Sequence, residues 1–227
     1  MQSAESPAQR LRDADNEPVG GRRRWLIAGV LVALLAGPGT AGGSAPRTHA
    51  LFFGDSLFSG NGAVPLRPVQ VITANRRLGW SSELDSFGGT GYTTGGPRGV
   101  PYLSRLRHDG VMARHFDVIV LEGGTNDAHH GSLTQLRAHA LAVIDYIQHR
   151  QPQARIVMVG GFPRHGPWPR YAEMDRILSE VAAARGLRYI SQQRYGTAGP
   201  GFYARDGLHP STRGYLQMGR DLATALR

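Results

Sequence analysis

The sequence contains no cysteine and no lysine. The lack of cysteine excludes disulfide bonds, thiolate metal ligands, a cysteine nucleophile and a cysteine-linked lipid anchor. All 26 basic side chains are therefore arginine, and the formal net charge of +9 raises the question of an anionic partner such as nucleic acid. The arginines are scattered, however, apart from Arg22–Arg24 and Arg76–Arg77, and no nucleic-acid-binding motif accompanies them. We therefore expect no nucleic-acid partner.

Metal ligands and long apolar runs are also missing. The histidine and aspartate residues lack the spacing of a metal site, so we expect neither a metal nor another cofactor. The apolar run at residues 25–36 is shorter than the roughly 20 residues that a membrane-spanning helix needs.

The first 45 residues have the make-up of an export segment. Arg22–Arg24 precede the apolar run, and small residues follow it at 37–45, which is typical of a signal peptide. The order Arg-Arg-Arg-Trp-Leu loosely resembles a twin-arginine signal. We predict a disordered leader over 1–24 and a signal core and cleavage region over 25–45, with the protein secreted or otherwise extracytoplasmic. An uncleaved membrane anchor over 25–45 remains the alternative, in which 37–45 joins the span.

Residues 46–227 are predicted to form one α/β domain. The length suits a single domain after a leader. Strand-like patterns occupy residues 49–53, 80–86, 117–122, 155–159 and 187–191. Helical patterns occupy residues 67–78, 102–107, 132–150, 171–185 and the segment after 211, with Ser132 and Ser211 as expected caps. This alternation predicts a three-layer α/β/α fold with a flavodoxin-like parallel sheet of about five strands.

Small polar residues and glycines follow three of the predicted strands. Ser56 follows the first strand, Gly91 the second and Asn126 the third. Because the carboxyl ends of parallel strands meet at one edge of a sheet, we expect these residues and His209 to share one rim. Taken alone, the pair Asp55–Ser56 is more typical of a helix N-cap than of a nucleophile.

The chain resembles the SGNH hydrolase superfamily, also called GDSL esterases and lipases. The matching blocks are Gly54–Leu57, the glycine-rich turn with Gly91, Gly124–Asp127 and Asp206–His209, in the family's order. They span about residues 48–227. The chain has no Gly-x-Ser-x-Gly elbow, which disfavours an ordinary α/β-hydrolase.

The resemblance implies a role for each matching residue. Ser56 would attack an ester carbonyl, His209 would take and return its proton, and Asp206 would orient the histidine ring. The oxyanion hole would consist of the backbone N–H groups of Ser56 and Gly91 and the side-chain amide of Asn126. Gly88 and Gly89 in the same turn are rivals of Gly91.

The resulting prediction is a secreted serine carboxylic-ester hydrolase that forms an acyl-enzyme. Short-chain esters, acetylated carbohydrates and lysolipids are the candidate substrates. An acyltransferase on the same fold is the alternative. A non-catalytic surface-attached binding module would require a broken triad, whereas Ser56, Asp206 and His209 are all present. We expect a monomer whose membrane contact is limited to its N-terminal segment.

Five aromatic residues in the predicted loops leave two interpretations open. They form either an apolar wall for the acyl group or ordinary loop packing. These residues are Phe162, Trp168, Tyr195, Phe202 and Tyr203.

Overall fold

A computed structural model describes residues 47–165 and 168–227. The predicted leader and signal region lie outside the described residues. Within the described part of the chain, no helix is long and apolar enough to span a bilayer.

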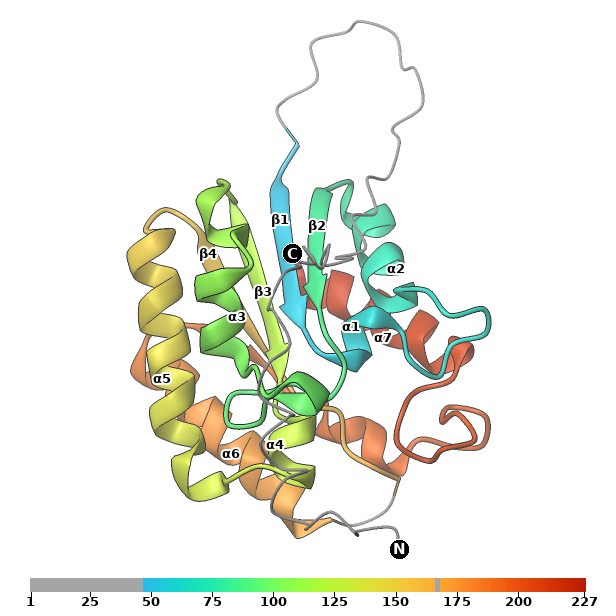
Figure 1. The fold of residues 1–227 in the computed structure, drawn as a ribbon. Coiled ribbons are helices and arrows are strands. Elements are labelled where there is room, and N and C mark those ends of the chain that lie inside the picture. The colour runs from blue at the N-terminus through green and yellow to red at the C-terminus, as the bar shows by residue number, and fades with distance from the viewer. Residues whose placement is uncertain (1–46, 166–167) are drawn as a thin grey trace, which may run out of the picture.

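Five parallel strands form one sheet at the centre of the domain (Figure 1). They are β1 (His49–Gly54), β2 (Ser81–Ser86), β3 (Val118–Gly123), β4 (Arg155–Gly160) and β5 (Arg188–Ile190). Their order across the sheet is β2-β1-β3-β4-β5. This order is the flavodoxin-like one, so the predicted fold class is confirmed.

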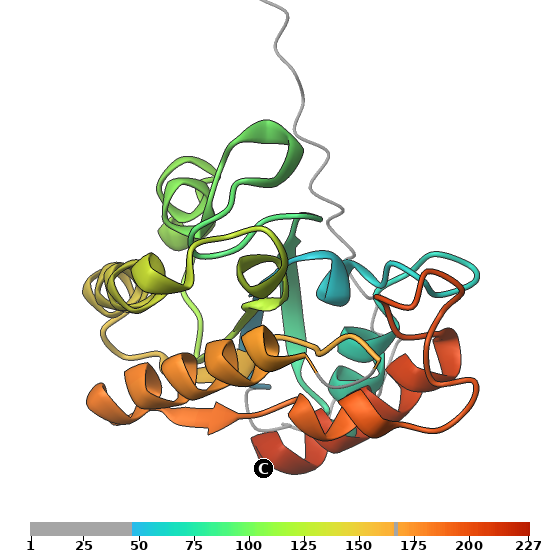
Figure 2. The same ribbon diagram turned by 90° about the horizontal axis from the view of Figure 1, so that it is seen from below.

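Helices cover both faces of the sheet (Figures 1 and 2). One face carries α2 (Val69–Leu78) and α7 (Thr212–Leu226), and the other carries α3 (Tyr102–His108), α5 (Leu133–Arg150) and α6 (Pro169–Ala184). Successive side chains of a strand point to opposite faces, so Leu51 and Phe53 pack under α3, α5 and α6, whereas Phe52 packs under α2 and α7. Because both faces are covered, β3 is buried along its whole length, which explains its continuous apolar sequence.

Two of the strands are followed at once by a short helix. Sequence periodicity did not predict either helix. α1 (Ser56–Ser59) follows β1, and α4 (Thr125–His129) follows β3. Each is too short to show a helical repeat in the sequence. The remaining short elements are 3-10 helices, η2 (Gly96–Arg98), η3 (Val111–Ala113) and η4 (Gln193–Thr197).

The helix caps only partly follow the sequence prediction. The Ser211 hydroxyl accepts a hydrogen bond from the Gly214 N–H at 3.2 Å and caps α7 as expected. Ser132 occupies the N-cap position of α5, but its hydroxyl pairs with that of Thr134 at 2.9 Å and makes no cap bond. The predicted N-cap position of Ser132 is therefore confirmed, but its side chain does not supply a cap hydrogen bond.

Candidate active site

Ser56, His209 and Asp206 are joined by hydrogen bonds at the carboxyl edge of the sheet. The Ser56 Oγ lies 3.0 Å from the His209 Nε2, and the His209 Nδ1 lies 2.7 Å from an Asp206 carboxylate oxygen. The second Asp206 oxygen accepts the backbone N–H groups of Leu208 and His209, each at 2.9 Å. Residues 153 positions apart in the sequence thus form one connected chain of polar groups.

The turn that carries Ser56 is built into the buried end of β1. Asp55 is the N-cap of α1, because one of its carboxylate oxygens accepts the Leu57 N–H at 2.8 Å. Ser56 is then the first helical residue rather than the cap. Gly54 lies against Glu122 of β3, and a Cβ at this position would come within 2.7 Å of the Glu122 carboxyl oxygen. Only glycine lets the two strand ends approach this closely.

Arg105 of α3 holds the ends of β1 and β2 together, a role that sequence reasoning missed. Its side chain is buried and donates to the Gly54 carbonyl at 2.8 Å and to the Thr90 hydroxyl at 2.9 Å. It also forms an ion pair with Asp85, and its guanidinium lies 4.4 Å from the centre of the Phe53 ring. A single arginine within a short helical pattern gave no signal that its charge is buried.

The Asn126 amide lies between the serine turn and the glycine-rich turn. Its Nδ2 donates to the second Asp55 carboxylate oxygen at 2.8 Å and to the Thr90 carbonyl at 2.9 Å. Asn126 is nine-tenths buried at the start of α4. The three strand-end turns predicted to share one rim are therefore in direct contact.

The glycines of the second turn have different surroundings. The Gly91 N–H donates to the Thr94 carbonyl at 2.8 Å, and a Cβ on Gly91 would overlap the Asp127 carboxylate. That carboxylate accepts the backbone N–H groups of Tyr92 at 3.1 Å and Thr93 at 2.6 Å. This is the turn-holding role expected of Asp127.

Gly88 is the glycine of this turn that lies beside the serine. A Cβ on Gly88 would lie 3.6 Å from the Ser56 Cβ, whereas one on Gly89 would contact Pro97. Among residues 47–165 and 168–227, the backbone N–H groups of Ser56 and Gly88 have no hydrogen-bond acceptor.

Burial sets the protonation of the carboxyl groups beneath the serine. Desolvation raises the pKa of Asp55 to about 6, against the opposing effect of the Leu57 N–H. Desolvation and the nearby charge of Asp55 raise the pKa of Glu122 well above its ordinary value. Partial burial of Asp206 also disfavours its charge, but the N–H groups of His209 and Leu208 and the His209 ring outweigh it, so its pKa lies below the ordinary value.

A packed aromatic cluster anchors the loop that carries Asp206 and His209. The Tyr203 hydroxyl lies between the Tyr195 carbonyl at 2.8 Å and the Pro163 carbonyl at 3.1 Å, and its one hydrogen is shared between them. Phe162 lies under this loop, with its ring centre 5.2 Å from that of Tyr203 and 6.2 Å from that of Phe202. Four of the five aromatic residues considered as an acyl wall therefore pack mainly against each other.

Trp168 lies apart from that cluster and is 48% exposed. The rings of His129 and His130 pack against each other at a tilt of 42°, with centres 4.0 Å apart, and burial lowers the pKa of His129. Within the described ranges, no three His, Asp or Glu side chains are grouped in a way that could hold a metal ion.

The sheet order and the residues at its carboxyl edge are those of an α/β protein of the SGNH hydrolase type. Residues 52–216 match the GDSL-like Lipase/Acylhydrolase family, and the chain belongs to this family.

Known proteins support this assignment. The platelet-activating factor acetylhydrolase IB subunit alpha1 of Bos taurus is 28% identical over 158 residues, which cover 65% of this chain and 67% of that protein. The human protein gives the same figures.

Solved structures share the fold. A lipase/acylhydrolase from Enterococcus faecalis superposes with a TM-score of 0.63 and 22% identity over 79% of this chain and 95% of that one. A family two carbohydrate esterase from Clostridium thermocellum, solved with cellohexaose, gives 0.64 and 20% over 81% of this chain and 65% of that one.

Proposed function

We propose that this chain is a serine esterase that hydrolyses carboxylic esters through an acyl-enzyme. The observation that carries the proposal is the continuous chain from the Ser56 Oγ through the His209 ring to the Asp206 carboxylate, at 3.0 Å and 2.7 Å. A serine hydroxyl is a weak nucleophile unless a neighbouring base accepts its proton, and this arrangement supplies that base.

The first step forms the acyl-enzyme. The Ser56 Oγ attacks the ester carbonyl carbon while its proton passes to the His209 Nε2. Asp206 accepts a hydrogen bond from the Nδ1–H, which selects the tautomer whose Nε2 is free to act as a base and stabilises the imidazolium. The tetrahedral intermediate then collapses, its carbon–oxygen bond to the alcohol breaks, and His209 gives its proton to the departing oxygen.

The second step releases the acid. A water molecule gives a proton to the His209 Nε2 and attacks the acyl carbon, and the bond to the Ser56 Oγ breaks as that proton returns to the serine. The products are one alcohol and one carboxylic acid, and Ser56 regains its hydroxyl.

Three donors are assigned to the developing oxyanion. The Ser56 N–H is supported by its lack of an acceptor within the described residues. The Asn126 amide is assigned from the family motif; both of its N–H groups are bonded, to Asp55 and to the Thr90 carbonyl, and one of these bonds would be exchanged for the oxyanion. The Gly91 N–H is assigned from the family motif and would exchange its bond to the Thr94 carbonyl for the oxyanion. Gly88, beside Ser56, is the rival donor. Each such donor contributes about 3 kcal/mol to transition-state stability.

Esters with short acyl groups are the proposed substrates. The relative named above is an acetylhydrolase, and one structural neighbour is a carbohydrate esterase. The aromatic cluster is consistent with the same choice, since Phe162 and Tyr195 are buried and do not present an exposed apolar wall to a long acyl chain.

Hydrolysis of p-nitrophenyl esters of increasing chain length tests the proposal. We expect the highest kcat/KM with acetyl or butyryl esters and a loss of at least about a thousandfold in Ser56→Ala. Ser59→Ala is the matched control, because Ser59 lies in the same short helix and bonds to the Ser86 hydroxyl instead. Full activity of Ser56→Ala, or no activity of the wild type on any ester, would refute the assignment. A sugar acceptor added to the reaction separates hydrolysis from acyl transfer.

We also propose export of the protein, which rests on the arginine-flanked apolar run at residues 22–36. N-terminal sequencing of the mature protein tests it, and a start at Met1 would rule out cleavage.

A further inference from the structure

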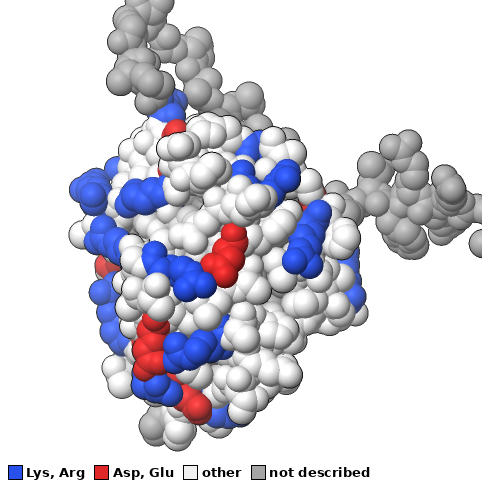
Figure 3. Space-filling model, turned by 90° about the vertical axis from the view of Figure 1, so that its left-hand side faces the viewer, with Lys and Arg blue, Asp and Glu red and all other residues white. Residues whose placement is uncertain are grey.

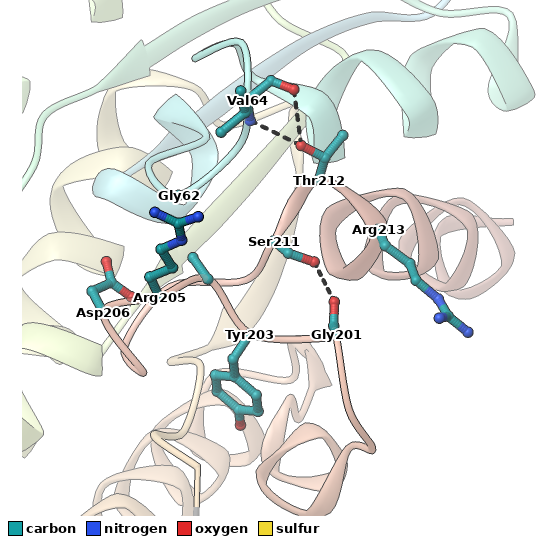
Figure 4. A pocket seen from close by; sticks show the side chains of 10 residues that line it. Gly62, Val64, Gly201, Tyr203, Arg205, Asp206, Ser211, Thr212 and Arg213 are labelled. Atoms are coloured by element: carbon teal, nitrogen blue, oxygen red, sulfur yellow. Dashed lines mark hydrogen bonds between the residues drawn. The ribbon is translucent and has the colours of Figure 1, made fainter.

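A hollow of about 830 Å³ lies between two loops beside the proposed triad (Figure 4). Its walls come from the segment after α1 and from the segment that leads into α7, and Asp206 lies on its edge. The two loops are hydrogen-bonded to each other, since the Val64 N–H donates to the Thr212 hydroxyl at 2.9 Å and that hydroxyl donates to the Val64 carbonyl at 3.2 Å. They also lie side by side in both views of the fold (Figures 1 and 2).

Apolar side chains gather at this hollow although they face solvent. The described residues contain four large exposed apolar side chains, and three of them are here: Val64 at 82%, Leu66 at 68% and Leu216 at 39% exposure. Val64 lines the hollow, and Leu66 follows two residues later on the same loop. Leu216 lies one helical turn beyond Thr212 on the same face of α7. Apolar side chains that gather in this way mark an interaction surface more often than chance exposure.

Three exposed arginines surround these apolar side chains. Arg205 and Arg213 line the hollow, and Arg67 adjoins Leu66. Within 47–165 and 168–227, none of the three forms an ion pair with an acidic side chain. Asp206 is the acidic residue on the wall of the hollow, and its carboxylate is bonded to His209.

The opposite side of the molecule differs in its charge pairing. On the face over α5 and α6, positive and negative side chains lie next to each other (Figure 3). Arg137 and Arg176 both pair with Glu180, and Arg185 pairs with Asp145 at 2.8 Å. The arginines at the hollow thus lack the acidic partners that Arg137, Arg176 and Arg185 have on the opposite side. What distinguishes them from other unpaired arginines among the described residues is that they adjoin exposed apolar side chains.

We propose that the surface formed by Val64, Leu66, Arg67, Arg205, Arg213 and Leu216 docks on an anionic phospholipid bilayer. Exposed aliphatic side chains gain free energy by entering the boundary between head groups and acyl chains. Arginines beside them reach lipid phosphates while their stems cover apolar surface. Charge complementarity selects an anionic membrane, because three arginines lie on this surface and only one carboxylate, that of Asp206, lines the hollow among the described residues. The sequence predicts membrane contact only through the N-terminal segment. The surface proposed here is a second, separate region.

A fluorophore at a single site tests this docking on the full chain. The sequence contains no cysteine, so Leu66→Cys accepts one nitrobenzoxadiazole label, and Arg150→Cys at the far end of α5 is the matched control. With vesicles of phosphatidylcholine and phosphatidylglycerol, we expect the emission at position 66 to shift to the blue and rise about twofold, because the label leaves water for the interface. The emission at position 150 stays unchanged.

The readout separates this surface from any membrane binding by the first 45 residues. A label at position 66 that does not respond overturns the proposal, whether or not the chain binds the vesicles through another segment. Equal responses at positions 66 and 150 also overturn it. An equal response to vesicles of phosphatidylcholine alone contradicts the role of the arginines.

Charge variants of the labelled Leu66→Cys chain sharpen the test. Replacing Arg67, Arg205 and Arg213 with Gln is expected to raise the anionic lipid concentration needed for half of the response at least about tenfold, since each surface arginine contributes about fivefold. Replacing Arg76, Arg150 and Arg188 with Gln removes the same net charge from other parts of the surface. This should change the lipid concentration needed for half of the response far less. Equal effects of the two triple variants would overturn the proposal, because only the net charge would then matter. None of these outcomes depends on the proposed esterase activity.

Discussion

The two halves of the proposed triad are supported in different ways. Ser56 is placed by the sheet, because its turn continues β1 and rests on buried Glu122 and Arg105. His209 is placed by a loop, which packs on an aromatic cluster and leaves the Asp206 side chain 47% exposed. The serine side therefore depends on buried charge and strand packing, and the histidine side on a few loop contacts. We expect changes under the serine to affect stability, and changes under the histidine to affect catalysis with little loss of stability.

The largest effect is expected on the histidine side. His209→Gln removes the proposed base and should lower kcat for ester hydrolysis by about ten thousandfold, with little change in the urea unfolding midpoint. His130→Gln is the matched control, since the His130 ring packs against that of His129, whereas the histidine bonded to Ser56 is His209. A small loss of kcat in His209→Gln would contradict the role of this residue.

On the serine side, Arg105→Met should be strongly destabilising. It leaves the Gly54 carbonyl and the Thr90 hydroxyl without their buried donor and breaks the ion pair with Asp85. A loss of about 3 kcal/mol is expected from urea unfolding. Arg107→Met, in the same helix but exposed over the Tyr146 ring, should change stability by less than about 0.5 kcal/mol. Equal effects of the two variants would remove the distinction between the two halves of the site.

The charge state beneath the serine gives a pH test. Since burial and the Asp55 charge raise the pKa of Glu122, the folded state binds a proton that the unfolded state releases above pH 4.5. The proton on Glu122 stabilises the folded state fully below pH 4.5, and this stabilisation is lost as the pH rises through the higher pKa of Glu122 in the folded state. The loss is about 1.4 kcal/mol for each pH unit that separates the folded-state and unfolded-state pKa values. Glu122→Gln resembles the protonated form and should lose less stability than wild type between pH 5 and 8. Parallel stability curves for the two proteins would show that Glu122 does not titrate in this range.

The smallest effect is expected from the loop anchor. Tyr203→Phe removes the hydroxyl that bonds to the Tyr195 and Pro163 carbonyls and should cost about 1 kcal/mol of stability. Because this loop carries His209, kcat should fall several-fold with KM nearly unchanged. Tyr146→Phe, whose hydroxyl makes only a 3.5 Å contact with the Leu106 carbonyl, is the control. An unchanged kcat in Tyr203→Phe would separate the aromatic cluster from the positioning of His209.

Local patterns in the sequence predicted the sheet and the contact between its strand-end turns. The apolar runs of β1, β3 and β4 and the glycine-rich ends of β1, β2 and β3 are short-range features, so they predicted both the strands and the rim on which Ser56 and Asn126 meet. The positions of Asp206 and His209 in the triad came from the family resemblance, because the loop that brings His209 to Ser56 has no repeat of its own.

Features that depend on long-range packing were not predictable from local patterns. In the sequence, Arg105 is one of many scattered arginines. It is buried because α3 places its side chain against Gly54 at the end of β1 and Thr90 in the turn after β2. The choice between Gly88 and Gly91 depends on the path of the second turn, which three nearby glycines leave free to vary. The packing of the aromatic residues under the proposed triad loop likewise depends on Phe162 and Pro163, which lie about 40 residues before Tyr203 in the sequence.

Covalent labelling identifies the nucleophilic residue. A fluorophosphonate reacts with an activated serine to form a stable phosphonyl ester, and mass spectrometry of digested peptides locates the modified residue. We predict one adduct per chain, on Ser56, in the wild type and none in Ser56→Ala. An adduct on another residue, or equal labelling of Ser56→Ala, would contradict the account.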